Sequence, residues 1–130
     1  MGKDILKDIN ILVVDDEEEI KDILRHDFTE LGANVHFAND GKDALDKIFN
    51  QNFDVILTDV AMPGYDGLQL IEEMTSSKLA IPIVVMTGYL KYIDELEHFD
   101  QIVRVIQKPF NVQEVASILK HAVLEEGDLT

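Results

Sequence analysis

Short apolar runs alternate along the chain with longer stretches in which apolar residues recur every three or four positions. Short runs between turn residues are typical of buried strands, and the longer pattern is typical of amphipathic helices. The five runs interpreted as strands are Ile9–Val14, Asn34–Ala38, Phe53–Thr58, Ile81–Met86 and Ile102–Ile106. A helical stretch follows each run, so strands and helices are predicted to alternate from end to end.

The helices are predicted from their apolar spacing and from residues that begin or end helices. Gly32 ends the first helical stretch, Asp40 precedes the second, and Asn111 with Glu114 resembles a capping box that opens the last. The predicted helices cover roughly residues 16–31, 42–49, 68–74, 90–99 and 112–123.

This alternation predicts a doubly wound α/β fold. Strands that are almost continuously apolar indicate a parallel sheet buried on both faces, and right-handed crossovers place helices on both of those faces. The flavodoxin-like order 2-1-3-4-5 puts a crevice at the carboxyl ends of strands 1 and 3. We expect residues 1–130 to form a single domain, with flexible ends at 1–8 and 125–130.

The composition narrows the classes of function. A formal net charge of −15 disfavours direct binding to nucleic acid or to anionic membranes, which requires clustered Lys and Arg. No apolar run approaches the roughly 20 residues that span a bilayer, and the N-terminus lacks a secretory signal pattern. The absence of cysteine excludes disulfides, thiolate metal sites and a cysteine nucleophile. We therefore expect a cytoplasmic protein.

Polar residues stand where four of the five predicted strands end. Asp15-Asp16, Asp59, Thr87 and Lys108 follow the first, third, fourth and fifth strands. Taken alone, the aspartates fit a helix cap or a turn, and Lys108 fits a solvated surface. Taken together, they gather on one rim of the sheet, where three carboxylates repel each other unless a cation lies among them. The pattern therefore predicts a divalent metal site.

At these positions the chain resembles the receiver domain of response regulators from two-component signalling. The resemblance covers almost the whole chain and rests on Ile11–Glu17, Asp40-Gly41 with Ala44, Asp54–Asp59, Met62–Gly67, Val84–Thr87 and Lys108-Pro109-Phe110. It implies a phosphorelay domain that accepts a phosphoryl group from a phosphohistidine and changes conformation to regulate an output domain or partner.

The resemblance implies a role for each residue of the site. Asp59 would be the phosphoacceptor, and Thr87 and Lys108 would bind the phosphoryl oxygens. The bond between Lys108 and Pro109 would be a cis peptide, since X–Pro bonds carry the lowest cis penalty.

The same resemblance implies Mg²⁺ as the cofactor, with Mn²⁺ as an alternative ion. Asp16, Asp59 and the backbone carbonyl of Ala61 would ligate Mg²⁺ directly, and Asp15 would act mainly through coordinated water. This ligand set suits a hard ion that prefers octahedral oxygen ligands and retains several waters.

The partners follow from the same resemblance. A sensor histidine kinase or a histidine phosphotransfer protein would supply the phosphoryl group, and an output domain or downstream protein would receive the signal. The domain would catalyse only its own phosphorylation and dephosphorylation, so it would not be an enzyme acting on other substrates. A homodimer through the fourth helix, fifth strand and fifth helix is one expected assembly.

The chain departs from the family pattern at a few positions. Val105 stands where the family often has an aromatic switch residue, so the output mechanism is expected to differ. Ala61 offers no side-chain group to orient water and Tyr89 is bulky, which predicts slow autodephosphorylation. Tyr89, Tyr92 and Val105 are candidates for an exposed output surface, with ordinary partial burial as the equal alternative.

Two other functions compete with the phosphorelay. A Mg²⁺-dependent phosphohydrolase with an aspartyl nucleophile usually needs a second Asp two residues later, but Glu17 and Ala61 occupy those places after Asp15 and Asp59. An interaction module that is never phosphorylated would tend to have lost part of the polar set, and this chain retains Thr87 and Lys108.

Overall fold

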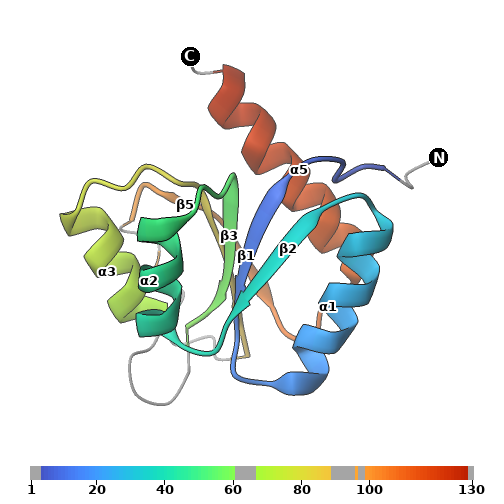
Figure 1. Ribbon diagram of the computed structural model, residues 1–130, viewed down its shortest axis with the longest axis horizontal. Coiled ribbons are helices and arrows are strands. Elements are labelled where there is room, and N and C mark those ends of the chain that lie inside the picture. Colours follow the sequence, from blue (N-terminus) through green and yellow to red (C-terminus); the bar gives the residue numbers. More distant parts are fainter. Residues whose placement is uncertain (1–3, 61–66, 89–95, 97–98, 129–130) are drawn as a thin grey trace.

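The computed structural model describes residues 4–60, 67–88, 96 and 99–128. Its centre is a sheet of five parallel strands in the order β2-β1-β3-β4-β5 (Figure 1). The strands are β1 (Asn10–Val14), β2 (Asn34–Ala38), β3 (Val55–Asp59), β4 (Ile83–Thr87) and β5 (Ile102–Gln107). The predicted strand order and parallel pairing are therefore confirmed.

The described helices cover both faces of the sheet. They are α1 (Glu18–Glu30), α2 (Gly41–Asn50), α3 (Gly67–Ser76) and α5 (Val112–Asp128). Helices α1 and α5 lie on one face, and α2 and α3 lie on the other (Figure 1). The helix predicted for residues 90–99 falls mostly outside the described residues, so its prediction remains open.

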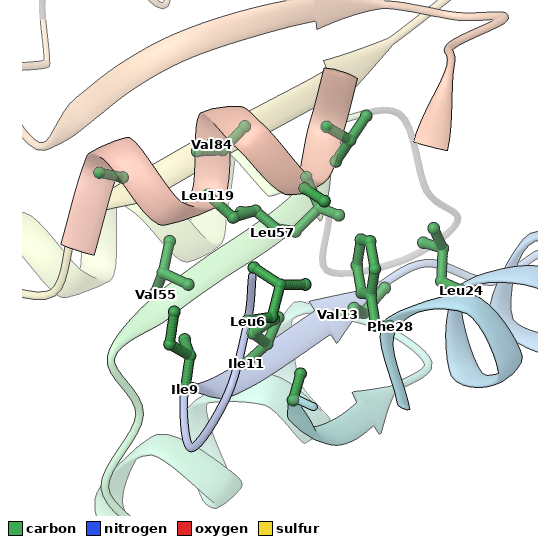
Figure 2. Close-up of a cluster of buried hydrophobic side chains, with 14 of the residues drawn as sticks. Leu6, Ile9, Ile11, Val13, Leu24, Phe28, Val55, Leu57, Val84 and Leu119 are labelled. Atoms are coloured by element: carbon green, nitrogen blue, oxygen red, sulfur yellow. The ribbon is translucent and has the colours of Figure 1, made fainter. Parts of the chain in front are cut away.

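Alternation along the central strands builds two cores. In β1, Ile11 and Val13 point toward α1 and α5, whereas Leu12 and Val14 point toward α2 and α3. All four side chains are fully buried, which is the pattern of a parallel sheet covered on both faces. Figure 2 shows the first core, where side chains of β1 and β3 meet those of α1 and α5.

Several predicted element ends are confirmed in atomic detail. Asp40 caps α2, because its Oδ1 accepts a hydrogen bond from the Asp43 N–H at 2.8 Å. Asn111 caps α5 in the same way, accepting from the Glu114 N–H at 3.1 Å. Gly32 follows α1 with φ +96°, a conformation that favours glycine.

Two strands begin two residues later than the apolar pattern predicts, and β1 begins one residue later. β3 begins at Val55 instead of Phe53, and β4 begins at Ile83 instead of Ile81. Pro82 has no N–H to donate to the ladder, although its carbonyl accepts from the Ile56 N–H at 3.0 Å. Both strands also extend one residue further, so that they include Asp59 and Thr87.

In the residues that the structure describes, both chain ends contain structure that the apolar pattern does not predict. Within residues 1–8, Leu6 is fully buried in the core of Figure 2, and its N–H donates to the Leu31 carbonyl at 2.9 Å. Leu6 and Ile5 form a short apolar pair between charged residues, and such a pair gives no periodic signal of a strand or helix. At the other end, α5 continues to Asp128, into the segment expected to be a tail.

Candidate functional site

The carboxyl ends of four neighbouring strands bring the predicted polar residues together. Asp15 directly follows β1, Asp59 and Thr87 are the last residues of β3 and β4, and Lys108 directly follows β5. Because β1, β3, β4 and β5 are consecutive neighbours in the sheet, their ends form one edge (Figure 1). The residues that the sequence predicts on one rim therefore lie on one rim.

Lys108 is the cation at the centre of this edge. Its Nζ lies 2.8 Å from Asp59 Oδ2, 3.1 Å from Asp15 Oδ2 and 3.2 Å from Glu17 Oε1. The side chain of Lys108 is 15% exposed, and those of Asp15 and Asp59 are 0% and 7% exposed. The ammonium group thus donates to three carboxylates at once, two of which are buried.

The main chain also holds Lys108 in place. Its N–H donates to the Thr87 carbonyl at 2.8 Å, which ties the end of β5 to the end of β4. The peptide bond between Lys108 and Pro109 is cis, as expected from the sequence. Lys108 is therefore fixed by its backbone as well as by its ion pairs.

Thr87 and the residue after it border the carboxylates. Thr87 is fully buried at the end of β4. The residue before it, Met86, pairs with Asp59 of the neighbouring strand β3. Apart from its chain neighbours, a Cβ added at Gly88 would meet no atom of the described residues within 4 Å. A group that approaches Asp59 from this side meets no obstruction from residue 88.

Burial and charge act in opposite directions on the titration of the site. Burial raises the pKa of Asp15 above its ordinary 3.8, although the Glu17 N–H at 2.8 Å and the Lys108 ammonium partly oppose this. For Lys108, burial alone would lower the pKa, but the hydrogen bond and charge of Asp59, together with Asp15, raise it. Lys108 is therefore charged at any physiological pH.

Replacing Asp15 with Asn is expected to stabilise the protein in the absence of metal. Because the pKa of Asp15 is raised in the folded protein, ionisation of Asp15 disfavours folding. This effect is absent below pH 3.8, the pKa of the unfolded chain. It grows as the pH rises and is complete above the pKa of the folded protein. We expect the melting temperature of Asp15→Asn at pH 7 to exceed that of the wild type by a few degrees. The difference should shrink toward about pH 4.

Melting curves in the presence of a chelator test this expectation, with Asp22→Asn on the exposed face of α1 as the control. A melting temperature for Asp15→Asn that is equal to or below the wild-type value at pH 7 would contradict it.

Comparison with known proteins identifies the family to which this arrangement belongs. Residues 11–120 match the family model described as the response regulator receiver domain. The chain belongs to this family. The matched segment contains every described residue of the polar edge, from Asp15 to Lys108, and places the chain among the signalling domains of two-component systems.

Individual relatives agree with this assignment. The chain is 33% identical over 118 residues to the regulatory protein AtoC of Escherichia coli, covering 87% of this chain and 25% of AtoC. The chain therefore spans about a quarter of that relative's length.

Two solved structures share the fold of this receiver domain. The receiver domain of the Francisella response regulator 1452 superposes with a TM-score of 0.84 at 26% identity, covering 92% of this chain and 99% of that one. The response regulator TrrA of Thermotoga maritima, in complex with Mg²⁺ and BeF, gives 0.79 at 32% identity, covering 88% and 98%.

The described carboxylates of this receiver domain form a group that suits a divalent cation. One oxygen each from Asp15, Glu17 and Asp59 lies within 4.8 Å of the others. Three carboxylates face one ammonium, so the pocket carries excess negative charge that a hard divalent ion such as Mg²⁺ would neutralise. The negative charge at this edge of the sheet therefore suits a hard divalent cation.

The metal ligands expected from the sequence occupy different places. Asp15 and Asp59 belong to the carboxylate group, but Asp16 is exposed and does not, and Glu17 takes the third place. Ala61 lies outside the described residues. The sequence does not predict Glu17 as a member of the site. Its position two residues after Asp15 nevertheless permits the turn in which the Glu17 N–H bonds the Asp15 carboxylate.

The expected output surface is described only in part. Tyr89 and Tyr92 lie outside the described residues. Val105 is half-buried in β5 and packs against the core on the α2 and α3 face. Among the helices that the structure describes, none is long and apolar enough to cross a membrane.

Proposed function

We propose that this receiver domain accepts a phosphoryl group from a phosphohistidine onto Asp59 in a Mg²⁺-dependent reaction. The observation that carries the proposal is the contact of 2.8 Å between Lys108 Nζ and Asp59 Oδ2 in a pocket shared with the buried Asp15. A carboxylate held beside a fixed ammonium can act as a nucleophile whose incoming phosphoryl group is stabilised as it arrives.

The transfer step is a displacement at phosphorus. An Asp59 carboxylate oxygen forms the new P–O bond, the P–N bond of the phosphohistidine breaks, and its electron pair returns to the imidazole nitrogen. Lys108, already donating to Asp59, donates to a phosphoryl oxygen as negative charge is transferred. The Thr87 hydroxyl donates to another phosphoryl oxygen.

Asp15, Asp16, Asp59 and the backbone carbonyl of Ala61 would hold Mg²⁺, with Mn²⁺ as an alternative ion. When bound, the ion supplies positive charge that offsets the crowded carboxylates and the entering phosphoryl oxygens. The TrrA complex with Mg²⁺ and BeF supports this choice of ion by analogy between the two chains, which are 32% identical.

Phosphorylation then biases the conformation of the domain. Thr87 is buried, and its engagement by a phosphoryl oxygen would draw the end of β4 toward the site. Val105 is too small to reproduce an aromatic switch, so the response is carried by Thr87 and the connection that follows β4. Ala61 offers no side-chain group to orient water and Tyr89 is bulky, so hydrolysis of the phosphoryl group is slow.

The partners proposed are those of a signalling domain acting in the cytoplasm. A sensor histidine kinase or histidine phosphotransfer protein donates the phosphoryl group, and an output domain or downstream protein responds, with homodimerisation through β5 and α5 as one form of response. An apolar groove of about 390 Å³ beside Lys108, lined by Ile20, Ile23 and Phe110, gives a donor protein a surface to contact.

A labelling experiment distinguishes this function from hydrolysis of phosphate esters. With acetyl phosphate and Mg²⁺, we expect no more than one phosphoryl group per chain. Repeated turnover of a small phosphate ester would favour the phosphohydrolase alternative.

Mg²⁺ is expected to stabilise the folded domain. Because the ion binds the assembled carboxylates and not the unfolded chain, a concentration about 100 times the dissociation constant should add about 2.7 kcal/mol to the free energy of unfolding. Melting curves at increasing Mg²⁺ measure the effect, with Na⁺ at equal ionic strength as the control. A melting temperature that responds equally to the two salts would contradict a specific site.

A further inference from the structure

Glu17 occupies the N-cap of α1 but does not cap the helix. N-cap side chains usually accept a hydrogen bond from the first turn, and Glu17 makes no such bond. Instead its Oε1 lies 3.2 Å from Lys108 Nζ, across the mouth of the pocket. Glu17 is thus part of the site through its contact with Lys108.

The backbone of Glu17 is fixed on both sides. Its N–H donates to Asp15 Oδ1 at 2.8 Å, and its carbonyl accepts from the Lys21 N–H at 3.1 Å in the first turn of α1. The Glu17 side chain therefore extends toward Lys108 from a backbone that Asp15 and the first turn of α1 hold in place. Such an anchored origin reduces the conformational entropy lost in reaching Lys108.

The three carboxylates around Lys108 differ in their burial and in the other contacts that the proposed function gives them. Asp15 and Asp59 are buried, and the proposed function engages both with Mg²⁺ and Asp59 with the phosphoryl group. Glu17 belongs to the same carboxylate group, but it is 57% exposed at the rim and is not among the proposed Mg²⁺ ligands. With Asp15 and Asp59 engaged by Mg²⁺, Glu17 would be the acceptor that still holds the Lys108 ammonium group.

We propose that Glu17 is a positioning residue that keeps Lys108 over Asp59 during phosphoryl transfer. This inference rests on the proposed function of Asp59. Glu17 acts through the lysine and touches neither the phosphoryl group nor the ion. Its negative charge also repels an anionic donor, so its effects on the maximal rate and on donor binding have opposite signs.

The test compares Glu17→Gln with Glu19→Gln, which removes the same charge from an exposed position in the first turn of α1. With acetyl phosphate and saturating Mg²⁺, we expect Glu17→Gln to lower the maximal rate of Asp59 phosphorylation by about three- to fivefold, the scale of a partly exposed ion pair. The KM for acetyl phosphate should stay equal or fall. Glu19→Gln should leave the maximal rate unchanged.

A second background isolates the route through Lys108. In a Lys108→Met protein, Glu17→Gln is expected to have no further effect on the rate, because the group that it positions is gone. A further threefold loss in that background would overturn the inference. A maximal rate for Glu17→Gln equal to that of the wild type would also overturn it.

Two measurements do not depend on phosphorylation. In metal-free protein, the ¹⁵Nζ resonance of Lys108 should shift in Glu17→Gln and not in Glu19→Gln; no shift would contradict the contact. The Kd for Mg²⁺ should change by less than about twofold, whereas a tenfold weakening would make Glu17 a metal ligand and overturn the positioning role. If the wild type itself gains no label at Asp59, the proposed function fails, and the resonance still reports on the contact.

Discussion

Asp59→Asn is expected to abolish phosphorylation, lowering the labelling rate by at least about a thousandfold. The carboxamide has neither the charge nor the nucleophilic oxygen of the carboxylate, and no other described residue presents a carboxylate to Lys108 at 2.8 Å. Asp15 is the nearest substitute, but its Oδ2 is 3.1 Å away and its Oδ1 is engaged by the Glu17 N–H. Asp15 should therefore not replace Asp59 as the phosphoryl acceptor.

The fold should survive this substitution. Asparagine has nearly the same shape as aspartate, and Lys108 keeps Asp15 and Glu17 as acceptors. Asp46→Asn on the exposed surface of α2 is a control for the chemical change alone. Intact-mass measurement after incubation with acetyl phosphate and Mg²⁺ gives the result, and circular dichroism checks folding. Equal labelling of folded Asp59→Asn and Asp46→Asn would exclude Asp59 as the acceptor.

Lys108→Met is expected to weaken both the fold and the reaction. Without the ammonium group, the buried Asp15 and Asp59 face each other with no described cation in contact, which should cost about 2 to 4 kcal/mol of unfolding free energy in metal-free protein. The same change removes a donor aimed at the transferring phosphoryl group, which should slow labelling by about a hundredfold or more.

Lys47→Met is a matched control for this prediction. Lys47 pairs with Asp43 at 2.9 Å on α2, where the two side chains are 31% and 36% exposed, so its loss should cost less than about 1 kcal/mol. Urea unfolding in a chelator compares the variants. Added Mg²⁺ should restore more stability to Lys108→Met than to the wild type, because the ion replaces the missing positive charge. Equal stabilities for the two variants would contradict the central role of Lys108.

The sequence predicts the fold well because the apolar runs coincide with burial in the central strands β1, β3 and β4. Ile11 and Val13 face one core and Leu12 and Val14 the other, so an uninterrupted apolar run predicts a strand buried on both faces. The polar residues that end these runs are brought together by topology alone. The sequence therefore predicts Asp15, Asp59, Thr87 and Lys108 on one edge of the sheet.

What the sequence did not predict depends on side-chain geometry and not on period. Glu17 reaches Lys108 from a turn in which its N–H bonds the Asp15 carboxylate. The spacing of the two residues permits that turn but does not indicate where the Glu17 side chain points. Leu6 is buried by contact with the segment after α1, a long-range contact without a local signal. Asp16 is exposed and lies outside the group of Asp15, Glu17 and Asp59, and its role as a direct metal ligand stays a prediction.

Location of the phosphoryl group on wild-type protein tests the central claim most directly. The protein is incubated with acetyl phosphate, with Mg²⁺ or with a chelator, then reduced with borohydride to trap any acyl phosphate, and its peptides are analysed by mass spectrometry. We predict modification at Asp59 alone, and only when Mg²⁺ is present. Modification at a different aspartate, or equal modification of Asp59 in the chelator, would contradict the account.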